Sequence, residues 1–195
     1  MSRRRVGIFG GSFNPVHIGH TIIADYIRQI CGLDEVWMML SPANPLKAGD
    51  EAPASDSHRM AMLRMAAEGI TGITACDFEL ALPRPSYSYI TLRELSRQFA
   101  DTDFTLIIGS DNWQKFNLWK NSQEILNNYP IIVYPRKGSE PDAASLPENV
   151  TVAMCPELEI SSTFIRKKIK EGLDMSLFLP AGVYSYIEKN HLYGK

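Results

Sequence analysis

Hydrophobic residues along the chain gather into six short runs whose composition is typical of β-strands. Five of the runs are rich in β-branched and other apolar residues, and one is weaker, at Gly72–Cys76. The other five lie at Val6–Phe9, Glu35–Leu40, Thr105–Ile108, Ile131–Tyr134 and Val150–Met154. Short apolar runs of this kind predict buried strands of a parallel sheet that is covered on both faces.

Helical patterns of apolar residues separate these runs. They lie at Ile18–Cys31, Ser57–Glu68, Tyr89–Phe99, Gln123–Asn128 and Ala181–Asn190. Gly32 and Gly69 end the first two patterns. Ser122 is a candidate cap for the fourth, and Pro180 stands at the start of the last. The alternation of strand and helix predicts an α/β fold, a Rossmann-like doubly wound parallel sheet in a single domain over residues 1–195.

Two longer segments, Ser41–Asp56 and Pro135–Asn149, interrupt this alternation and are rich in Pro, Ala, Gly, Ser and acidic residues. That composition predicts loops rather than linkers between domains. Sheets of this class bind ligands beyond the carboxyl ends of their strands, where the strand order reverses. The loop after Phe9 is therefore the first candidate for a ligand site, and the two long loops are candidate lids or substrate walls.

The segment after the first predicted strand combines paired glycines with two histidines at a helix start. Gly10 and Gly11 allow a tight turn and a close approach of the backbone to a ligand. A helix start offers free N–H groups and a positive dipole end. His17 and His20 lie three residues apart, so their rings project to the same side. The pattern predicts a cradle for phosphate groups.

Other interpretations of this segment stay open on the residues alone. A glycine pair after a strand is common in α/β proteins, and the histidines could be a cap and a core residue. They could also be half of a metal site, but His58 and His191 form no cluster that would supply the remaining ligands. The spacing differs from the G-x-G-x-x-G of dinucleotide-binding proteins, which argues against an ordinary dehydrogenase.

A second candidate anion site lies near the end of the chain. Ser161, Ser162 and Thr163 precede a helical pattern, which is a capping signature, and Arg166 follows one turn inside the helix. A guanidinium at this position can bind two phosphate oxygens at once, which a lysine does less well. The alternative is a capped surface helix with a solvated basic face.

Both segments resemble the signatures of the HxGH nucleotidyltransferase superfamily, specifically of the bacterial nicotinate-nucleotide adenylyltransferases. Residues 10–20 read GGSFNPVHIGH, similar to G-G-[ST]-F-[DN]-P-x-H-x-G-H, and residues 160–166 read ISSTFIR, similar to I-S-[ST]-T-x-[IV]-R. Asn14 stands where many relatives have Asp. The resemblance implies catalytic roles for His17, His20 and Arg166, and ATP binding by Gly10, Gly11, Ser12, Phe13, His17, His20, Gly109, Asp111, Arg136, Ser161, Ser162, Thr163 and Arg166.

The same resemblance implies a binding site for the second substrate. Its residues would be Asn44, Lys47, Ser86, Tyr87, Ser88, Asp111 and Trp119. Trp119 would stack on a pyridine ring, with Trp113 as its rival, although a tryptophan at this spacing is more often part of the core. Asp111 could instead cap a helix that begins near Asn112, and loop lysines such as Lys47 are usually solvated. Arg59 is interpreted mainly as a helix-packing residue.

The implied reaction is attack by the 5′-phosphate of nicotinic acid mononucleotide on the α-phosphorus of ATP, with release of pyrophosphate. No metal site on the protein is expected, because Mg²⁺ would be carried by the ATP phosphates. Alternatives are adenylyl transfer to nicotinamide mononucleotide or to another phosphate acceptor such as phosphopantetheine. A non-catalytic nucleotide-binding module and a Rossmann oxidoreductase are the alternatives outside this class.

Composition adds limits on location and partners. The chain has 195 residues and a formal net charge of -2, so nothing global attracts a nucleic acid or an anionic membrane. Its 3 cysteines form no C-x-x-C pair, which fits a reducing compartment. No segment has the ~20 apolar residues of a membrane span, and the apolar run after the first arginines is too short for a signal peptide. We expect a cytoplasmic protein, and whether it forms a homo-oligomer stays open.

Overall fold

Six parallel strands form one sheet in the computed structural model, which describes residues 3–42, 54–139, 146–156 and 158–194. The strands are β1 (Arg4–Gly11), β2 (Glu35–Leu40), β3 (Ile73–Cys76), β4 (Thr102–Gly109), β5 (Ile131–Tyr134) and β6 (Val150–Val152). All six predicted strands are confirmed, including the weak third one. The last is shorter than expected: the backbone leaves the sheet after Ala153, whose N–H donates to the carbonyl of Val133 on β5.

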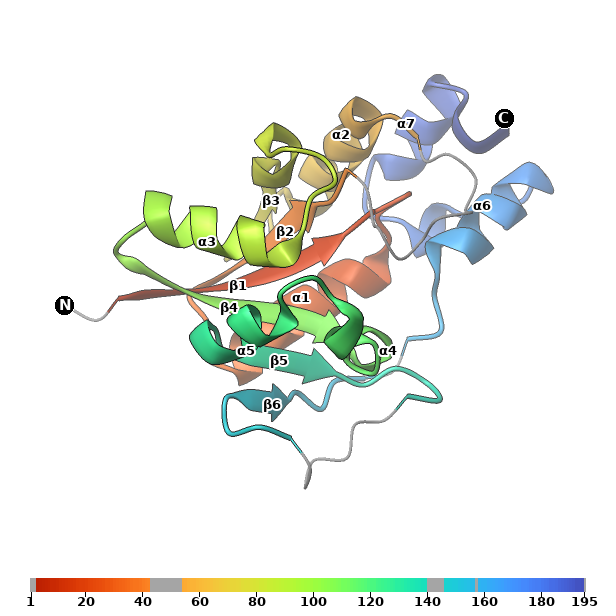
Figure 1. Ribbon diagram of the computed structural model, residues 1–195. Helices are drawn as coiled ribbons and strands as arrows, with labels where there is room; N and C mark the ends of the chain where they lie inside the picture. Colours follow the sequence, from red (N-terminus) through yellow and green to blue (C-terminus); the bar gives the residue numbers. More distant parts are fainter. Residues whose placement is uncertain (1–2, 43–53, 140–145, 157, 195) are drawn as a thin grey trace.

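The strand order is β3-β2-β1-β4-β5-β6, and every neighbouring pair is parallel (Figure 1). The order runs one way from β1 to β3 and the other way from β4 to β6. It therefore reverses between β1 and β4, which lie side by side at the middle of the sheet. Ligands of doubly wound sheets bind at such a reversal, beyond the carboxyl ends of the strands.

Seven α-helices cover the sheet in the described part of the chain. They are α1 (Ile18–Ile30), α2 (Asp56–Ala67), α3 (Ser88–Gln98), α4 (Ser110–Trp113), α5 (Ser122–Asn128), α6 (Ser162–Lys170) and α7 (Val183–Lys189). Short 3₁₀ helices are η1 (Phe78–Ala81), η2 (Phe116–Leu118), η4 (Ser176–Phe178) and η5 (Leu192–Gly194). The expected helices are confirmed, with bounds that differ by one or two residues. Ser122 is the first residue of α5 and not its cap, which is Asn121. α7 begins at Val183 because Gly182 before it has a left-handed backbone, with φ 80°.

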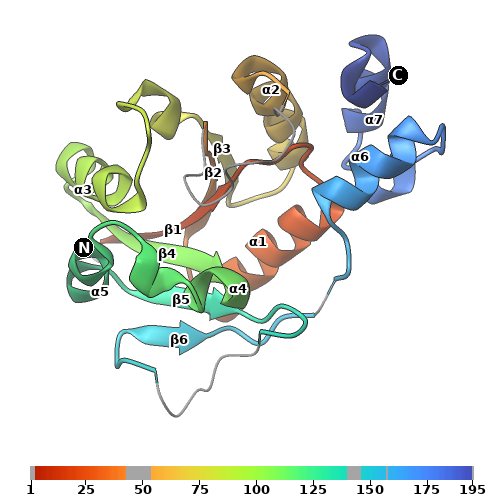
Figure 2. The same cartoon turned by 45° about the vertical axis from the view of Figure 1, so that its right-hand side comes forward.

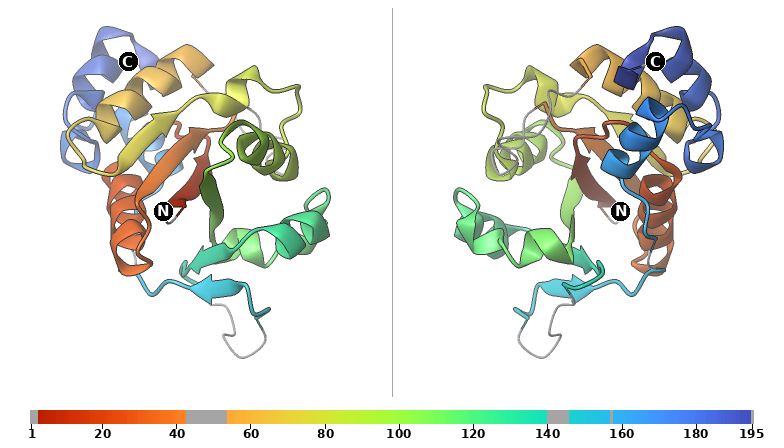
Figure 3. Two further views of the ribbon diagram at one scale, coloured as in Figure 1. Left: turned by 90° about the vertical axis from the view of Figure 1, so that its left-hand side faces the viewer. Right: turned by 90° about the vertical axis from the view of Figure 1, so that its right-hand side faces the viewer.

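The helices divide between the two faces of the sheet (Figure 3). On one face lie α1, α2, α6 and α7, and on the other lie α3, α4 and α5. Successive side chains of a strand point to opposite faces. Accordingly, Phe9 and Met38 join the core under α1 and α2, whereas Ile8 and Met39 join the core under α3. The doubly wound architecture is thus confirmed, with a separate apolar core on each face.

None of the described helices between residues 3 and 194, gaps aside, is both long and apolar enough to cross a membrane.

Candidate active site

The loop from β1 to α1 lies at the point where the strand order reverses, and close packing fixes its shape. Phe13 has a positive φ of 44° and its ring is 1% exposed, packed edge-on against the ring of His20 at 5.0 Å. A Cβ atom on Gly11 would lie 2.9 Å from the Phe13 ring. A Cβ on Gly19 would lie 3.0 Å from Nδ1 of His17. A side chain at Gly11 would therefore collide with the Phe13 ring, and one at Gly19 would press on the His17 ring.

The two histidines of this loop stack on each other. Their ring centroids are 3.6 Å apart and their planes differ by 26°. The backbone N–H of His17 donates to Nδ1 of His20 at 3.1 Å. Because that nitrogen accepts a hydrogen bond, the proton of a neutral His20 ring lies on Nε2. The loop thus selects the tautomer in which His20 donates through Nε2.

His17 is more deeply buried than His20. It is 5% exposed, and no described residue bonds its Nδ1. Burial, together with the nearby positive charge of Arg136, lowers the pKa of His17 to about 4. The ring is therefore neutral at pH 7 in the free protein. Desolvation thus outweighs the ordinary basicity of the His17 ring, which contributes a neutral imidazole to the loop.

The second motif lies directly against this loop, as expected. Ser161 caps α6 by accepting a hydrogen bond from the N–H of Phe164 at 3.1 Å. Ser162 donates to the carbonyl of Pro15 at 2.8 Å, and Arg166 donates to the carbonyl of Asn14 at 2.8 Å. These partners are 147 and 152 residues apart in the sequence. The two motifs therefore form one polar site at the start of α1 and α6.

A further cation approaches from β5. Arg136 lies 3.6 Å from the carboxylate of Asp111 and donates to the hydroxyl of Tyr134 at 3.1 Å. A Cβ on Gly109 would lie 2.5 Å from the Asp111 carboxylate and 3.0 Å from Nε of Arg136, so a larger residue there would displace these two side chains. Asp111 belongs to the first turn of α4, which begins at Ser110 rather than near Asn112.

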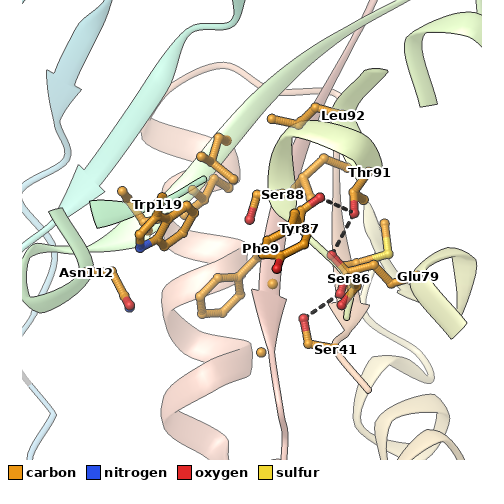
Figure 4. Close-up of a pocket in the computed structure, with 18 of the residues that line it drawn as sticks. Phe9, Ser41, Glu79, Ser86, Tyr87, Ser88, Thr91, Leu92, Asn112 and Trp119 are labelled. Carbon is orange, nitrogen blue, oxygen red and sulfur yellow. Dashed lines mark hydrogen bonds between the residues drawn. The ribbon is translucent and has the colours of Figure 1, made fainter. Parts of the chain in front are cut away.

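A cavity of about 280 Å³ opens between the ends of β1 and β4 (Figure 4). Its floor is formed by both strands, and its walls come from α3, the turn after β4, and η2. The lining residues include Gly10, Gly11, Ser12, Ser41, Glu79, Ser86, Tyr87, Ser88, Gly109, Asn112, Trp119 and Lys120. The cavity therefore joins the first motif to the predicted binding residues of the second substrate.

The aromatic wall of the cavity separates the two tryptophan candidates. Trp119 lines the cavity, and the described atoms offer no partner to its Nε1. Trp113 is not among the lining residues and stacks on Phe116, with ring centroids 5.1 Å apart. The Phe116 ring in turn contacts Trp119 at 5.5 Å. Trp113 thus supports the wall from behind, and Trp119 faces the space that a ring would occupy.

The polar wall lies opposite, at the start of α3. Tyr87 is the N-cap residue of this helix, and Ser86, Tyr87 and Ser88 all line the cavity. The first N–H groups of a helix have no partner within the helix, so they are available to an anionic group. Lys120 lies 4.7 Å over the ring of Tyr87 and adds a positive charge at this wall.

A buried carboxylate at this wall was missed by the sequence analysis. Glu79 is 6% exposed and accepts hydrogen bonds from Ser41 at 2.5 Å and Thr91 at 2.8 Å (Figure 4). Burial raises the pKa of Glu79, and these two donors oppose that rise. No local signal could have identified it, because an acidic residue between two elements is ordinarily solvated and its partners lie 38 and 12 residues away.

Arg59 does more than the packing role expected for it. Its side chain is 0% exposed and donates to the carbonyls of Ser12 at 2.6 Å, Ser41 at 2.9 Å and Ala54 at 2.9 Å. It also pairs with Asp56 at 2.5 Å. A buried arginine is stable only with such partners. Arg59 therefore holds the loop after β1 and the end of β2 at a fixed separation.

Two predicted binding residues, Asn44 and Lys47, lie outside the described residues. Within the described ranges, no three His, Cys, Asp or Glu side chains are grouped so that they could hold a metal ion.

Comparison with known proteins places this site in a family. The family model Cytidylyltransferase-like matches residues 8–168. A Bacteroides fragilis protein named "Probable nicotinate-nucleotide adenylyltransferase" is 46% identical over 188 residues, covering 96% of this chain and 92% of that protein. A protein of the same name from Flavobacterium johnsoniae is 40% identical over 193 residues, covering 98% of this chain and 100% of that protein.

A solved structure agrees with this placement at the level of the fold. The Plasmodium falciparum nicotinic acid mononucleotide adenylyltransferase complexed with NaAD has a TM-score of 0.80 and 20% identity, with 97% of each chain covered. The fold, the joined motifs and the relatives at 40% and 46% identity agree. The chain belongs to the cytidylyltransferase-like family and, within it, to the nicotinate-nucleotide adenylyltransferases, as the resemblance of its two motifs predicted.

Proposed function

We propose that this chain transfers the adenylyl group of ATP to nicotinic acid mononucleotide and releases nicotinic acid adenine dinucleotide and pyrophosphate. A phosphate oxygen of the mononucleotide forms a bond to the α-phosphorus of ATP, and the bond from that phosphorus to the β-phosphate oxygen breaks. The observation that carries the proposal is the meeting of two anion-binding motifs with a cavity lined by Trp119. The product serves NAD biosynthesis.

The chain's own contribution is positioning and electrostatic stabilisation, since the attacking phosphate is already ionised at neutral pH. His20 donates from Nε2 to the reacting phosphates, because its Nδ1 is occupied by the His17 N–H. His17 acts as a neutral donor at the helix start. Arg166 keeps one nitrogen on the carbonyl of Asn14 and has further N–H groups for phosphate oxygens.

The remaining ATP contacts follow from the same arrangement. Backbone N–H groups of the loop after β1 and of the α6 start surround the phosphates, and Asp111 and Arg136 meet the nucleoside beyond β4 and β5. These contacts involve Gly10, Gly11, Ser12, Phe13, Gly109, Asp111, Arg136, Ser161, Ser162 and Thr163. Magnesium enters as part of the substrate, MgATP, and adds positive charge to the phosphates.

Nicotinic acid mononucleotide occupies the cavity in this proposal. Its pyridine ring stacks on Trp119, and its carboxylate faces the N–H and hydroxyl donors of Ser86, Tyr87 and Ser88. Asn44, Lys47 and Asp111 complete this substrate's binding. We propose further that residues 1–195 act as one domain in the cytoplasm, and the single sheet supports the one-domain part of this proposal.

The test is product formation by the purified chain with MgATP and either mononucleotide. We expect equimolar pyrophosphate and acid dinucleotide, identified by mass, and a lower rate with nicotinamide mononucleotide. His20→Ala serves as the control for contaminating activity. If the amide dinucleotide forms faster than the acid dinucleotide, the acceptor is nicotinamide mononucleotide. If ATP binds but no dinucleotide forms, the chain is a non-catalytic nucleotide-binding module.

A further inference from the structure

The C-terminal end of the chain returns to the active-site loop. The short helix η5 packs against α6, and Figure 2 shows the terminus beside α6 and α7. Within η5, the backbone of Tyr193 has a positive φ of 63°. Its hydroxyl donates to Oδ1 of Asn14 at 2.8 Å, across 179 residues of sequence. A residue near the very end of the chain thus contacts the first phosphate-binding motif.

Asn14 is the junction through which this contact reaches the site. Its side chain is 7% exposed, and Oδ1 also accepts the N–H of Ala54 at 3.1 Å, so both lone pairs of that oxygen are used. The backbone carbonyl of the same residue accepts from Arg166 at 2.8 Å. Tyr193 therefore helps to set the orientation of Asn14. That orientation positions the backbone carbonyl that accepts from the Arg166 guanidinium.

The hydroxyl of Tyr193 can donate this hydrogen bond over a wide pH range. Burial raises the pKa of Tyr193 far above its ordinary value, and the positive charges of Arg166 and Arg59 oppose that rise only in part. The hydroxyl therefore stays protonated throughout the pH range in which proteins of this kind are assayed. Asn14 can only accept at Oδ1, so the donor and acceptor roles in this pair are fixed.

We propose that Tyr193 is a positioning residue for adenylyl transfer: through Asn14 it holds the loop carbonyl that orients Arg166 toward the phosphates. The proposal rests on the adenylyltransferase function proposed above. An interaction that aligns a group for the transition state affects kcat more than KM, because the ground state tolerates misalignment better. Removing the hydroxyl should therefore slow turnover while the chain still binds ATP.

The direct test is Tyr193→Phe, which keeps the ring and its packing but removes the donor. We expect kcat to fall about 10-fold, since small misplacements of catalytic groups cost ~10–100-fold, with KM for ATP within about 2-fold. Tyr184→Phe is the matched control on the adjoining helix α7, where the hydroxyl lies 3.5 Å from the carbonyl of Leu173. The control should keep its kcat within about 2-fold of the wild type.

A double-mutant cycle separates positioning from simple stabilisation. If Tyr193 acts through Asn14 on Arg166, the losses in kcat of Tyr193→Phe and Arg166→Lys should be less than multiplicative when combined. A purely structural role predicts a lower melting temperature, unchanged kcat at 25 °C and multiplicative losses. That outcome would overturn the proposal.

Hydrogen exchange tests the tether between Tyr193 and Asn14 independently of catalysis. Hydrogen exchange of the peptide 12–21 should be faster in Tyr193→Phe than in Tyr184→Phe, because the loop loses a tether. If the wild type forms no dinucleotide, the proposed reaction fails, whereas faster exchange still supports the tether to Asn14. Unchanged exchange in residues 12–21 would reject the coupling whatever the activity.

Discussion

The site has two sides that are held together by different interactions. The phosphate side, residues 10–20 with the start of α6, is fixed by side chains that donate to backbone carbonyls, among them Arg59 to Ser12 at 2.6 Å and Arg166 to Asn14 at 2.8 Å. The cavity side, from Ser86 to Trp119, is held by packed aromatic rings and by the buried carboxylate of Glu79.

This difference has a consequence for catalysis. Side chains that hold the carbonyls of Ser12, Pro15 and Asn14 fix the backbone of the phosphate side, and donors on such a preorganised backbone act on charge that develops during reaction. Stacked rings and an apolar wall instead bind a substrate nearly as well before the transition state as within it. We therefore expect changes on the phosphate side to lower kcat and changes on the cavity side to raise KM.

The largest expected effect concerns the buried imidazole of the phosphate side. The pKa of His17 is about 4 in the folded chain and 6.5 in the reference state. Between these values the unfolded chain binds a proton and the folded chain does not, so the free energy of unfolding falls as pH falls from 6.5 to 4. The share due to His17 is about 3 kcal/mol.

Denaturant unfolding at several pH values checks this share. His17→Gln lacks the titrating ring. The difference in the free energy of unfolding between wild type and variant should therefore change by about 3 kcal/mol between pH 6.5 and pH 4. A constant difference would mean that His17 titrates normally in the fold, and the neutral-donor role would be wrong.

The next effect tests the reacting side directly. His20→Ala should lower kcat by ~100-fold or more while ATP still binds, because the Nε2–H donor acts mainly on charge that builds in the transition state. Steady-state kinetics together with ATP titration calorimetry give both quantities. A variant with near-normal kcat would remove His20 from the chemistry.

A smaller effect is expected when only the geometry of a charge changes. Arg166→Lys keeps the charge but loses the simultaneous contact with the Asn14 carbonyl and the phosphates, so kcat should fall ~10-fold. The same kinetic assay measures this loss. Full activity in Arg166→Lys would show that the arginine only joins α6 to the loop.

The fold could be predicted from the sequence because its signals are local. Buried parallel strands are apolar throughout, so runs such as Ile131–Tyr134 were found with their bounds. The proximity of the two motifs could also be predicted, because each lies at a helix start and both resemble signatures of one family. The bound of the last strand was less secure, because the apolar run continues to Met154 beyond the point where pairing ends.

Most features that could not be predicted depend on contacts made only in the assembled fold. Arg59 donates to a carbonyl 47 residues away, and Tyr193 donates to an amide oxygen 179 residues away. No local periodicity or spacing in the sequence indicates either contact. The neutral state of His17 depends on burial, which is a property of the assembled fold. Trp119 and Trp113 look alike in sequence, and only the position of the cavity separates them.

We propose that nicotinic acid mononucleotide is the acceptor, with its ring held by Trp119 and its carboxylate recognised at Ser86–Ser88. Stacking treats acid and amide rings nearly alike, whereas a wall made of donors favours the carboxylate. The choice between the acid and the amide should therefore depend on the serine loop and not on the tryptophan.

The most direct measurement is kcat/KM for both mononucleotides in the wild type, Trp119→Ala and Ser88→Ala. The wild type should prefer the acid. Trp119→Ala should lose ~5–150-fold with both substrates, the equivalent of about 1–3 kcal/mol of stacking, and keep the ratio between them. Ser88→Ala should reduce the preference ~5-fold, the effect of about one hydrogen bond. A tryptophan variant that loses the acid preference, beside a serine variant that retains it, would show that Trp119 and not the serine loop selects the acid.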